Sequence, residues 1–180
     1  MSNFVIKLFG ICAFIVMALS YQMKGKKGLL FLHFISYTLL LIESVLLGSF
    51  IMVAVFSIYI VRAIACFAEE SKEEKNKKIF FSFLLIVLVA GFLTWNGAAS
   101  IFSIIASLIF TFALFSKNTS TMRKFFLMAS MASVVAGILG GSLWGILKEL
   151  AYVVSIIFAI VRFDNKKIEE TPEPSNPENV

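Results

Sequence analysis

Long apolar runs alternate with short polar segments along the 180-residue chain, and this alternation predicts membrane-spanning helices. A helix needs about 20 apolar residues to cross a hydrocarbon layer roughly 30 Å thick. On this criterion we divide the chain into seven predicted spans. Their bounds are Phe4–Tyr21, Gly28–Leu46, Phe50–Phe67, Ile79–Thr94, Ala98–Phe115, Phe125–Leu139 and Leu143–Val161. The predicted fold is an all-α membrane protein with seven transmembrane helices.

Two of the predicted connections are tight hairpins that contain glycine. The apolar run on both sides of Gly48-Ser49 is too long for one crossing and holds only His33 and Glu43 as ionisable groups. A turn at Gly48-Ser49 divides this run, because glycine adopts the backbone conformations that a tight turn needs. The segment 140–142, Gly-Gly-Ser, predicts a second hairpin of the same kind.

The basic residues predict the orientation of these spans. Fourteen of the sixteen lysines and arginines fall into four clusters near span ends. The clusters are Lys24, Lys26 and Lys27; Arg62, Lys72, Lys75, Lys77 and Lys78; Lys117, Arg123 and Lys124; and Arg162, Lys166 and Lys167. Because basic loops stay in the cytoplasm, we expect the N-terminus outside and the C-terminus in the cytoplasm. The segment 18–20 resembles a signal-peptidase site, but the basic cluster follows it, so we expect the first span to be retained.

Composition supports a membrane protein and excludes several other classes. Hydrophobic residues make up 59% of the chain, and the mean hydropathy of +0.93 leaves too little polar surface for a water-soluble globule. The net charge of +5 lies at span ends, where it meets lipid headgroups, so we expect a lipid bilayer and no nucleic acid as partner. The two cysteines, Cys12 and Cys66, predict neither a disulfide framework nor a metal site.

The chain divides into a seven-helix transmembrane domain, residues 1–163, and a tail, residues 164–180. All three prolines lie in this tail among acidic and polar residues. Such a segment buries too little apolar surface to fold, so we expect a disordered cytoplasmic tail.

A shift of 93 residues reveals a faint internal repeat. It pairs Lys24 with Lys117, Gly48-Ser49 with Gly141-Ser142, and Tyr59 with Tyr152. Spans one to three and five to seven both read as helix, basic loop, helix, Gly-Ser hairpin, helix. The third helix of each triplet is expected to end in Ile-Val-Arg, at Arg62 and Arg162. The fourth span then acts as a linker that gives both triplets the same orientation, a 3+1+3 arrangement found in transporters.

This arrangement resembles that of the SWEET sugar facilitators and their PQ-loop relatives. Those families use prolines of the repeat helices as hinges, whereas this chain has no proline before Pro172 and no Pro-Gln motif. The resemblance therefore implies a shared architecture without the same hinge mechanism.

A second resemblance covers nearly the whole chain. It rests on Gln22, Lys24, Leu47-Gly48, Arg62, Trp95, Gly97, Gly141-Ser142, Gly145, Glu149 and Arg162. On these residues the chain resembles the YgjV family of small bacterial inner-membrane proteins. The resemblance implies a multi-pass protein of the bacterial cytoplasmic membrane and no established biochemical activity. Where the family is expected to have a histidine before the first Leu-Gly turn, this chain has Glu43.

Ionisable residues within spans are the first candidates for a site, because charge at membrane depth is costly. Lys7, Glu43, Lys148 and Glu149 each lie about 5 to 10 Å from the outer interface when the helical rise is applied. One interpretation is an outward-facing vestibule that binds a solute or a proton. The other is that these side chains reach the headgroups or form a structural ion pair. If one of the adjacent pair Lys148 and Glu149 faces the bundle, we expect Glu149.

Two further candidates are polar or aromatic groups. His33 has Tyr37 one helical turn further on, so the two could share a hydrogen bond, although a structural histidine explains the pair as well. A single histidine makes no metal site. Trp95-Asn96 combines a stacking ring with an amide that suits a sugar or nucleoside, while interfacial anchoring is the alternative.

A stripe of small residues follows the sixth predicted span. Ala129, Ser133, Gly137 and Gly141 recur every four residues. Small residues let helix backbones approach closely, so we expect this span to pack deep in the bundle or at the interface of a homo-oligomer.

Function is predicted from the architecture, because the sequence contains no catalytic motif and we expect neither an enzyme nor a cofactor. The first hypothesis is a small-solute transporter or facilitator that handles a small polar solute. The alternative is a non-transporting scaffold or regulatory protein that acts through the charged segment 69–78 or the acidic tail. A seven-helix receptor is a third hypothesis. A polar cavity at the repeat interface favours transport, whereas a solidly packed bundle favours the scaffold.

Overall fold

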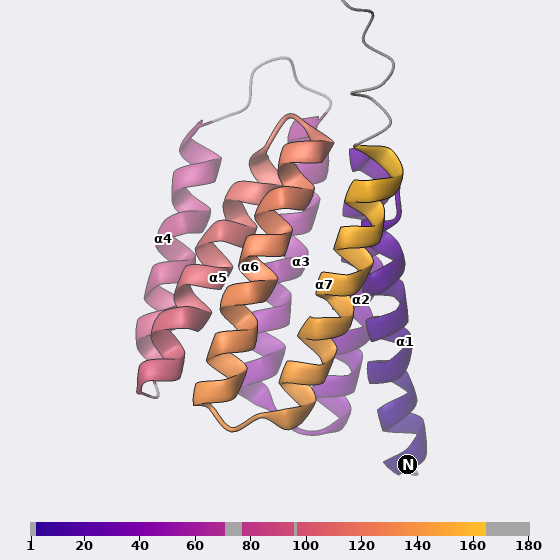
Figure 1. Ribbon diagram of the computed structural model, residues 1–180. Helices are drawn as coiled ribbons and strands as arrows, with labels where there is room; N and C mark the ends of the chain where they lie inside the picture. Colours follow the sequence, from indigo (N-terminus) through magenta and orange to yellow (C-terminus); the bar gives the residue numbers. More distant parts are fainter. Residues whose placement is uncertain (1–2, 71–76, 96, 165–180) are drawn as a thin grey trace, which may run out of the picture.

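The computed structural model describes residues 3–70, 77–95 and 97–164, and all regular elements within these residues are α-helices (Figure 1). The seven helices lie side by side, and successive helices run in opposite directions. They are α1 (Asn3–Tyr21), α2 (Lys26–Leu46), α3 (Phe50–Glu70), α4 (Lys77–Leu93), α5 (Ala98–Phe115), α6 (Thr119–Leu139) and α7 (Leu143–Phe163). The prediction of seven helices is therefore correct. Asp164, the first residue of the predicted tail, is ordered, because it caps α7 and pairs with Arg123; the rest of that tail, residues 165–180, lies outside the described residues.

Five of these helices are long and apolar enough to cross a membrane, by length and composition: α2, α3, α5, α6 and α7. Helix α4 has 17 residues, and the apolar part of α1 is the segment Val5–Tyr21. Large apolar side chains cover the outside of the bundle, among them Phe50, Leu93 and Leu143. A soluble monomer rarely exposes apolar patches larger than a few hundred Å², so this surface is suited to lipid.

Several helices extend beyond the predicted spans, especially α3 and α6. Helix α6 begins at Thr119 instead of Phe125, because the Asn118 side chain accepts a hydrogen bond from the Ser120 amide at 3.0 Å and caps the helix. Helix α3 continues to Glu70, eight residues past Arg62. Hydropathy marks where the lipid-facing surface ends, whereas the helix continues as long as its backbone is hydrogen-bonded.

Helices consecutive in sequence pack together, and we call α1–α3 and α5–α7 the two triplets for their contacts alone. Helix α2 packs between α1 and α3, and α6 packs between α5 and α7. Helix α4 lies mainly against α5, and α1 contacts α7 (Figure 1). A core of buried residues, including Tyr21, Met122, Phe126 and Ile156, joins the two triplets.

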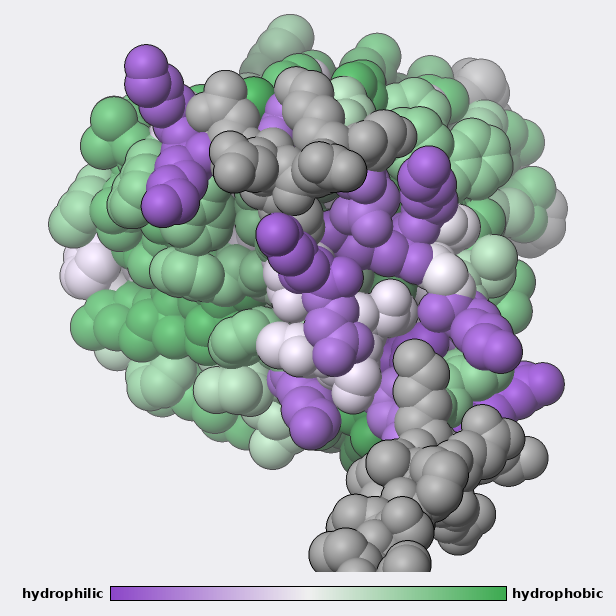
Figure 2. All heavy atoms as spheres, turned by 90° about the horizontal axis from the view of Figure 1, so that it is seen from above, coloured by the Kyte–Doolittle hydropathy of each residue, from purple (hydrophilic) through white to green (hydrophobic). Residues whose placement is uncertain are grey.

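The two ends of the bundle differ in chemistry. We call one the glycine end, because the hairpins after α2 and α6 turn there through Gly48 and Gly141, with φ of 68° and 66°. Both predicted hairpins are thus present. We call the other the basic end, since it carries the α1–α2 and α5–α6 loops and the start of α4. Figure 2 shows hydrophilic residues gathered over the middle of the basic end and hydrophobic residues around them.

Candidate functional site

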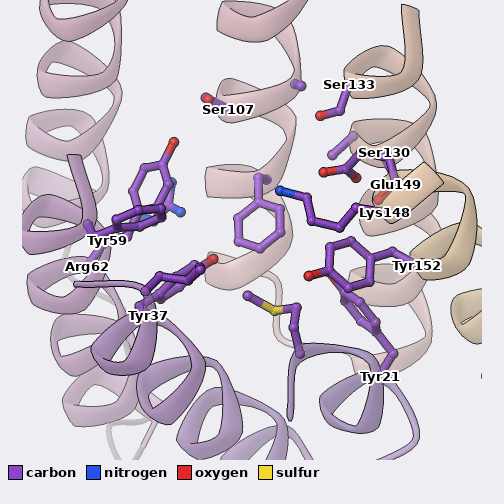
Figure 3. A pocket seen from close by; sticks show the side chains of 16 residues that line it. Tyr21, Tyr37, Tyr59, Arg62, Ser107, Ser130, Ser133, Lys148, Glu149 and Tyr152 are labelled. Atoms are coloured by element: carbon purple, nitrogen blue, oxygen red, sulfur yellow. The ribbon is translucent and has the colours of Figure 1, made fainter. Parts of the chain in front are cut away.

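A polar cavity lies in the middle of the bundle, enclosed by α1, α2, α3, α5, α6 and α7. Its volume is 160 Å³. Figure 3 shows Arg62, Tyr37 and Tyr59 on one side and Lys148, Glu149 and Tyr152 on the other. Two charged groups from α7 and one from α3 therefore line the same space.

Next to this inner cavity lies a larger vestibule of 630 Å³ that is lined by α3, α4, α5, α6 and α7. The two spaces share Tyr59, Ser107, Ser133, Lys148 and Glu149 among their lining residues. The vestibule also reaches Ile51 at the start of α3, Thr94 after α4 and Ser142 before α7. It therefore extends from the centre of the bundle to the glycine end.

Arg62 is the most deeply buried charge of the cavity, with 1% of its surface exposed. Its Nη1 donates a hydrogen bond to the Thr111 hydroxyl at 3.0 Å. The guanidinium lies over the Tyr59 ring at 4.6 Å and the Phe110 ring at 5.1 Å, and Tyr37 lies nearby. Such cation–π contacts stabilise a desolvated arginine by up to about 2 kcal/mol.

Glu149 and Lys148 lie on the opposite side of the cavity, in the first half of α7. The Glu149 carboxylate lies near the buried Ser130 hydroxyl of α6. The Lys148 side chain extends toward the middle of the cavity (Figure 3). Adjacent residues are about 100° apart around a helix. Glu149 lines the cavity, and its neighbour Lys148 lines it as well.

A layer of aromatic rings separates the cavity from the basic end. His33 is fully buried at its centre. Its ring stacks on Phe126 with centroids 5.4 Å apart and meets the edge of Tyr21 at 5.5 Å. Its Nδ1 donates to the Leu29 carbonyl at 3.0 Å, while Nε2 has no hydrogen-bond partner among the described residues. The His33 and Tyr37 rings contact each other with centroids 5.9 Å apart, and among the described residues the two alternatives differ in outcome: no hydrogen bond joins the pair, which leaves the structural histidine.

Two buried cations at the basic end hold the triplets together; we call this pair the clamp, Lys26 and Arg123. Lys26, at the start of α2, pairs with Glu70 of α3 and donates to the Ser116 carbonyl at 2.7 Å. Arg123, on α6, pairs with Asp164 at 2.7 Å and donates to the Met23 carbonyl at 2.8 Å. Each cation thus binds an acid at the end of α3 or α7 and a loop carbonyl of the other triplet.

A comparison with protein families confirms the resemblance to the YgjV family that the sequence indicates. The sequence model of Imp-YgjV, described as a bacterial inner membrane protein family, matches residues 4–167. The chain belongs to this family. No curated protein and no solved structure matches the chain. The compartment of this Imp-YgjV protein, the bacterial inner membrane, is thereby shown.

The structure places most of the other predicted site residues of this Imp-YgjV protein outside the cavity. Lys7 is exposed on α1, and the carboxylate of Glu43 lies against Gly10, where α1 and α2 approach closely. Trp95 is half exposed and stacks on Phe92, with ring centroids 6.2 Å apart. Asn96 lies outside the described residues.

The small residues of α6 have several different surroundings. Ala129 and Ser133 line the inner cavity, and Gly137 faces Ile146 of α7 beside the vestibule. Gly141 belongs to the hairpin. The stripe therefore provides space for the cavity as well as close helix contact.

Arg62, Lys26 and Arg123 are buried, but the sequence pattern does not distinguish them from exposed cations, because all three belong to basic clusters near span ends. The proposed equivalence of Arg62 and Arg162 is wrong. Arg62 lies in the interior of α3, whereas Arg162 is exposed one residue before the end of α7. The signal that could have identified Arg62 is its place within an apolar run of helical periodicity, flanked by Tyr59 and Cys66.

Proposed function

We propose that this Imp-YgjV protein is a transporter or facilitator of a small polar solute, without enzymatic activity. The observation that carries the proposal is a cavity lined by charged and hydroxyl groups beside a larger vestibule, which shares lining residues with it and reaches the glycine end. Charged and hydroxyl groups inside a membrane bundle are unfavourable unless they line a water-filled space or bind one another. A protein that serves only as a scaffold has no need for such a space.

The two helix triplets support a repeat architecture of the 3+1+3 kind. Shifted by 93 residues, the bounds of α2 coincide with those of α6, and the bounds of α3 coincide with those of α7. The hairpins repeat at the level of single hydrogen bonds. Ser49 donates from its amide to the Ser44 carbonyl, and Ser142 donates to the Gly137 carbonyl. The clamp repeats too, since the acceptor carbonyls of Met23 and Ser116 are related by the same shift.

The proposal includes seven crossings, with the basic end in the cytoplasm and the glycine end outside. The basic residues of the loops support this orientation. The vestibule then opens outward, while the aromatic layer and the clamp close the cytoplasmic side. Transport by alternating access requires that the clamp opens and the vestibule closes in turn.

The test is solute permeation into liposomes that contain the purified protein. Osmotic swelling is recorded by light scattering with polyols, sugars, amino acids and carboxylates, and empty liposomes give the background. We expect faster swelling with at least one solute class and its loss in Glu149→Gln, because the substitution removes a charge from the cavity. Glu43→Gln is the matched control, since Glu43 lies outside the cavity. No protein-dependent permeation of any class would refute transport and favour the scaffold or regulatory role.

A further inference from the structure

We propose that Arg62 is the recognition residue for an organic anion and that the cavity takes a small monocarboxylate. This inference rests on the proposed function and names its solute class. Within the described part of the chain, Arg62 has no carboxylate partner: its contacts are a hydroxyl from Thr111, two aromatic rings and Tyr37. Its Nε, which is buried, has no hydrogen-bond partner there.

A buried guanidinium is unfavourable unless its charge is matched and its N–H groups are hydrogen-bonded. The other two buried cations of the described residues have their charge matched, because Lys26 pairs with Glu70 and Arg123 with Asp164, although the Arg123 Nε also has no hydrogen-bond partner there. Arg62 differs from them in lining the cavity instead of a protein interface. The planar guanidinium forms two parallel hydrogen bonds with a carboxylate, so a carboxylate supplies what the site lacks.

The other charged groups of the cavity are consistent with a solute that carries a single negative charge. Arg62 and Lys148 contribute two cations and Glu149 one anion, which leaves one positive charge for the solute to match. The walls combine the rings of Phe56 and Phe110 with tyrosine hydroxyls, and so suit a short apolar body next to the carboxylate. The volume of 160 Å³ is close to that of cavities that accommodate benzene.

The experiment uses the full-length protein in detergent and three ligands of one shape: benzoate, benzamide and benzylammonium. Binding is measured by isothermal titration calorimetry and by the rise in melting temperature that a native-state ligand produces. We expect benzoate to bind and the other two to bind at least tenfold more weakly, because they lack the charge that the guanidinium pairs with.

Variants connect the binding to Arg62. Arg62→Gln is expected to weaken benzoate binding at least tenfold, and Arg62→Lys, which keeps the charge and perturbs folding less, to weaken it by a smaller factor. Arg162→Gln is the matched control, because Arg162 is exposed at the end of α7, and it should bind as the native protein does.

Equal binding of benzoate and benzamide, or native affinity for benzoate in Arg62→Lys and Arg62→Gln, would overturn the proposal. Failure of the anion site is distinguishable from failure of transport. If liposomes show Glu149-dependent permeation of neutral or cationic solutes and benzoate does not bind, transport is supported and the anion site is refuted. If benzoate binds through Arg62 and no solute permeates, the anion site is supported and transport is refuted.

Discussion

Gly48 and Gly141 are single residues on which the two hairpins of the glycine end depend. Both have positive φ, 68° and 66°. A Cβ at these positions meets no other atom within 4 Å, so the cost of alanine comes from the backbone alone. Left-handed backbone costs an L-residue about 1 to 2 kcal/mol. We predict that Gly48→Ala and Gly141→Ala each lower the free energy of unfolding by about this amount.

Unfolding of the purified variants in detergent, by heat or denaturant, measures this loss. Gly25→Ala is the matched control. Gly25 has an ordinary φ of −101°, and a Cβ there also meets no atom within 4 Å. A loss of stability in Gly25→Ala as large as in the hairpin variants would show that side-chain space or chain entropy, and not φ, determines the cost.

Individual site residues were predictable from the sequence where their chemistry contrasted with their neighbours. Lys148 and Glu149 are charges within an apolar run, so the sequence alone marks them as candidates. Arg62 could not be recognised in the same way, because it precedes a basic loop and resembles one more cytoplasmic charge. Only the packing of α3 against α5 shows that its guanidinium meets Thr111 and Phe110.

At the scale of elements, the clamp joins α3, the α5–α6 loop and α2 through Lys26. Cys66 of α3 is buried one turn before Glu70, so it reports whether this end of the bundle opens. We predict that Lys26→Met increases the rate at which a maleimide reacts with Cys66 several-fold, because the loss of both contacts releases α3 from the loop. The measurement uses membrane vesicles and a Cys12→Ser background.

Lys27→Met is the control for the clamp experiment, since Lys27 is the exposed neighbour of Lys26 and the substitution makes the same change in charge. If both variants label Cys66 at the native rate, the clamp does not hold the basic end closed. If both accelerate labelling equally, surface charge explains the effect instead of the buried contacts.

The helices themselves were largely predictable, whereas their ends were not. Hydropathy located all seven, and the hairpins followed from their glycines. Hydropathy placed the start of α6 six residues late, because Arg123 and Lys124 resemble loop residues when only polarity is considered. The structure shows that Arg123 is buried and pairs with Asp164. A charged residue at a helix end can therefore be exposed to solvent or buried in an ion pair, and its polarity alone does not distinguish these two environments.

At the scale of the whole molecule, the vestibule reaches one end of the bundle, so under the proposed transport function the orientation of the protein determines the side from which a solute would enter. We predict that a cysteine at Leu47, exposed in the turn after α2, reacts with a membrane-impermeant maleimide in intact cells. A cysteine at Lys24, exposed in the α1–α2 loop, should react only after lysis. Both substitutions are made in a background without Cys12 and Cys66.

The physical reason is that lysine and arginine near span ends stay on the cytoplasmic side, and the exposed cations of the described residues concentrate at the basic end. The opposite labelling pattern would place the vestibule in the cytoplasm and make the clamp an external closure. The polar cavity and its anion site would then stay as described, but the solute would enter from the cytoplasm. Orientation and site chemistry are therefore separate properties, and the labelling experiment tests the first without assuming the second.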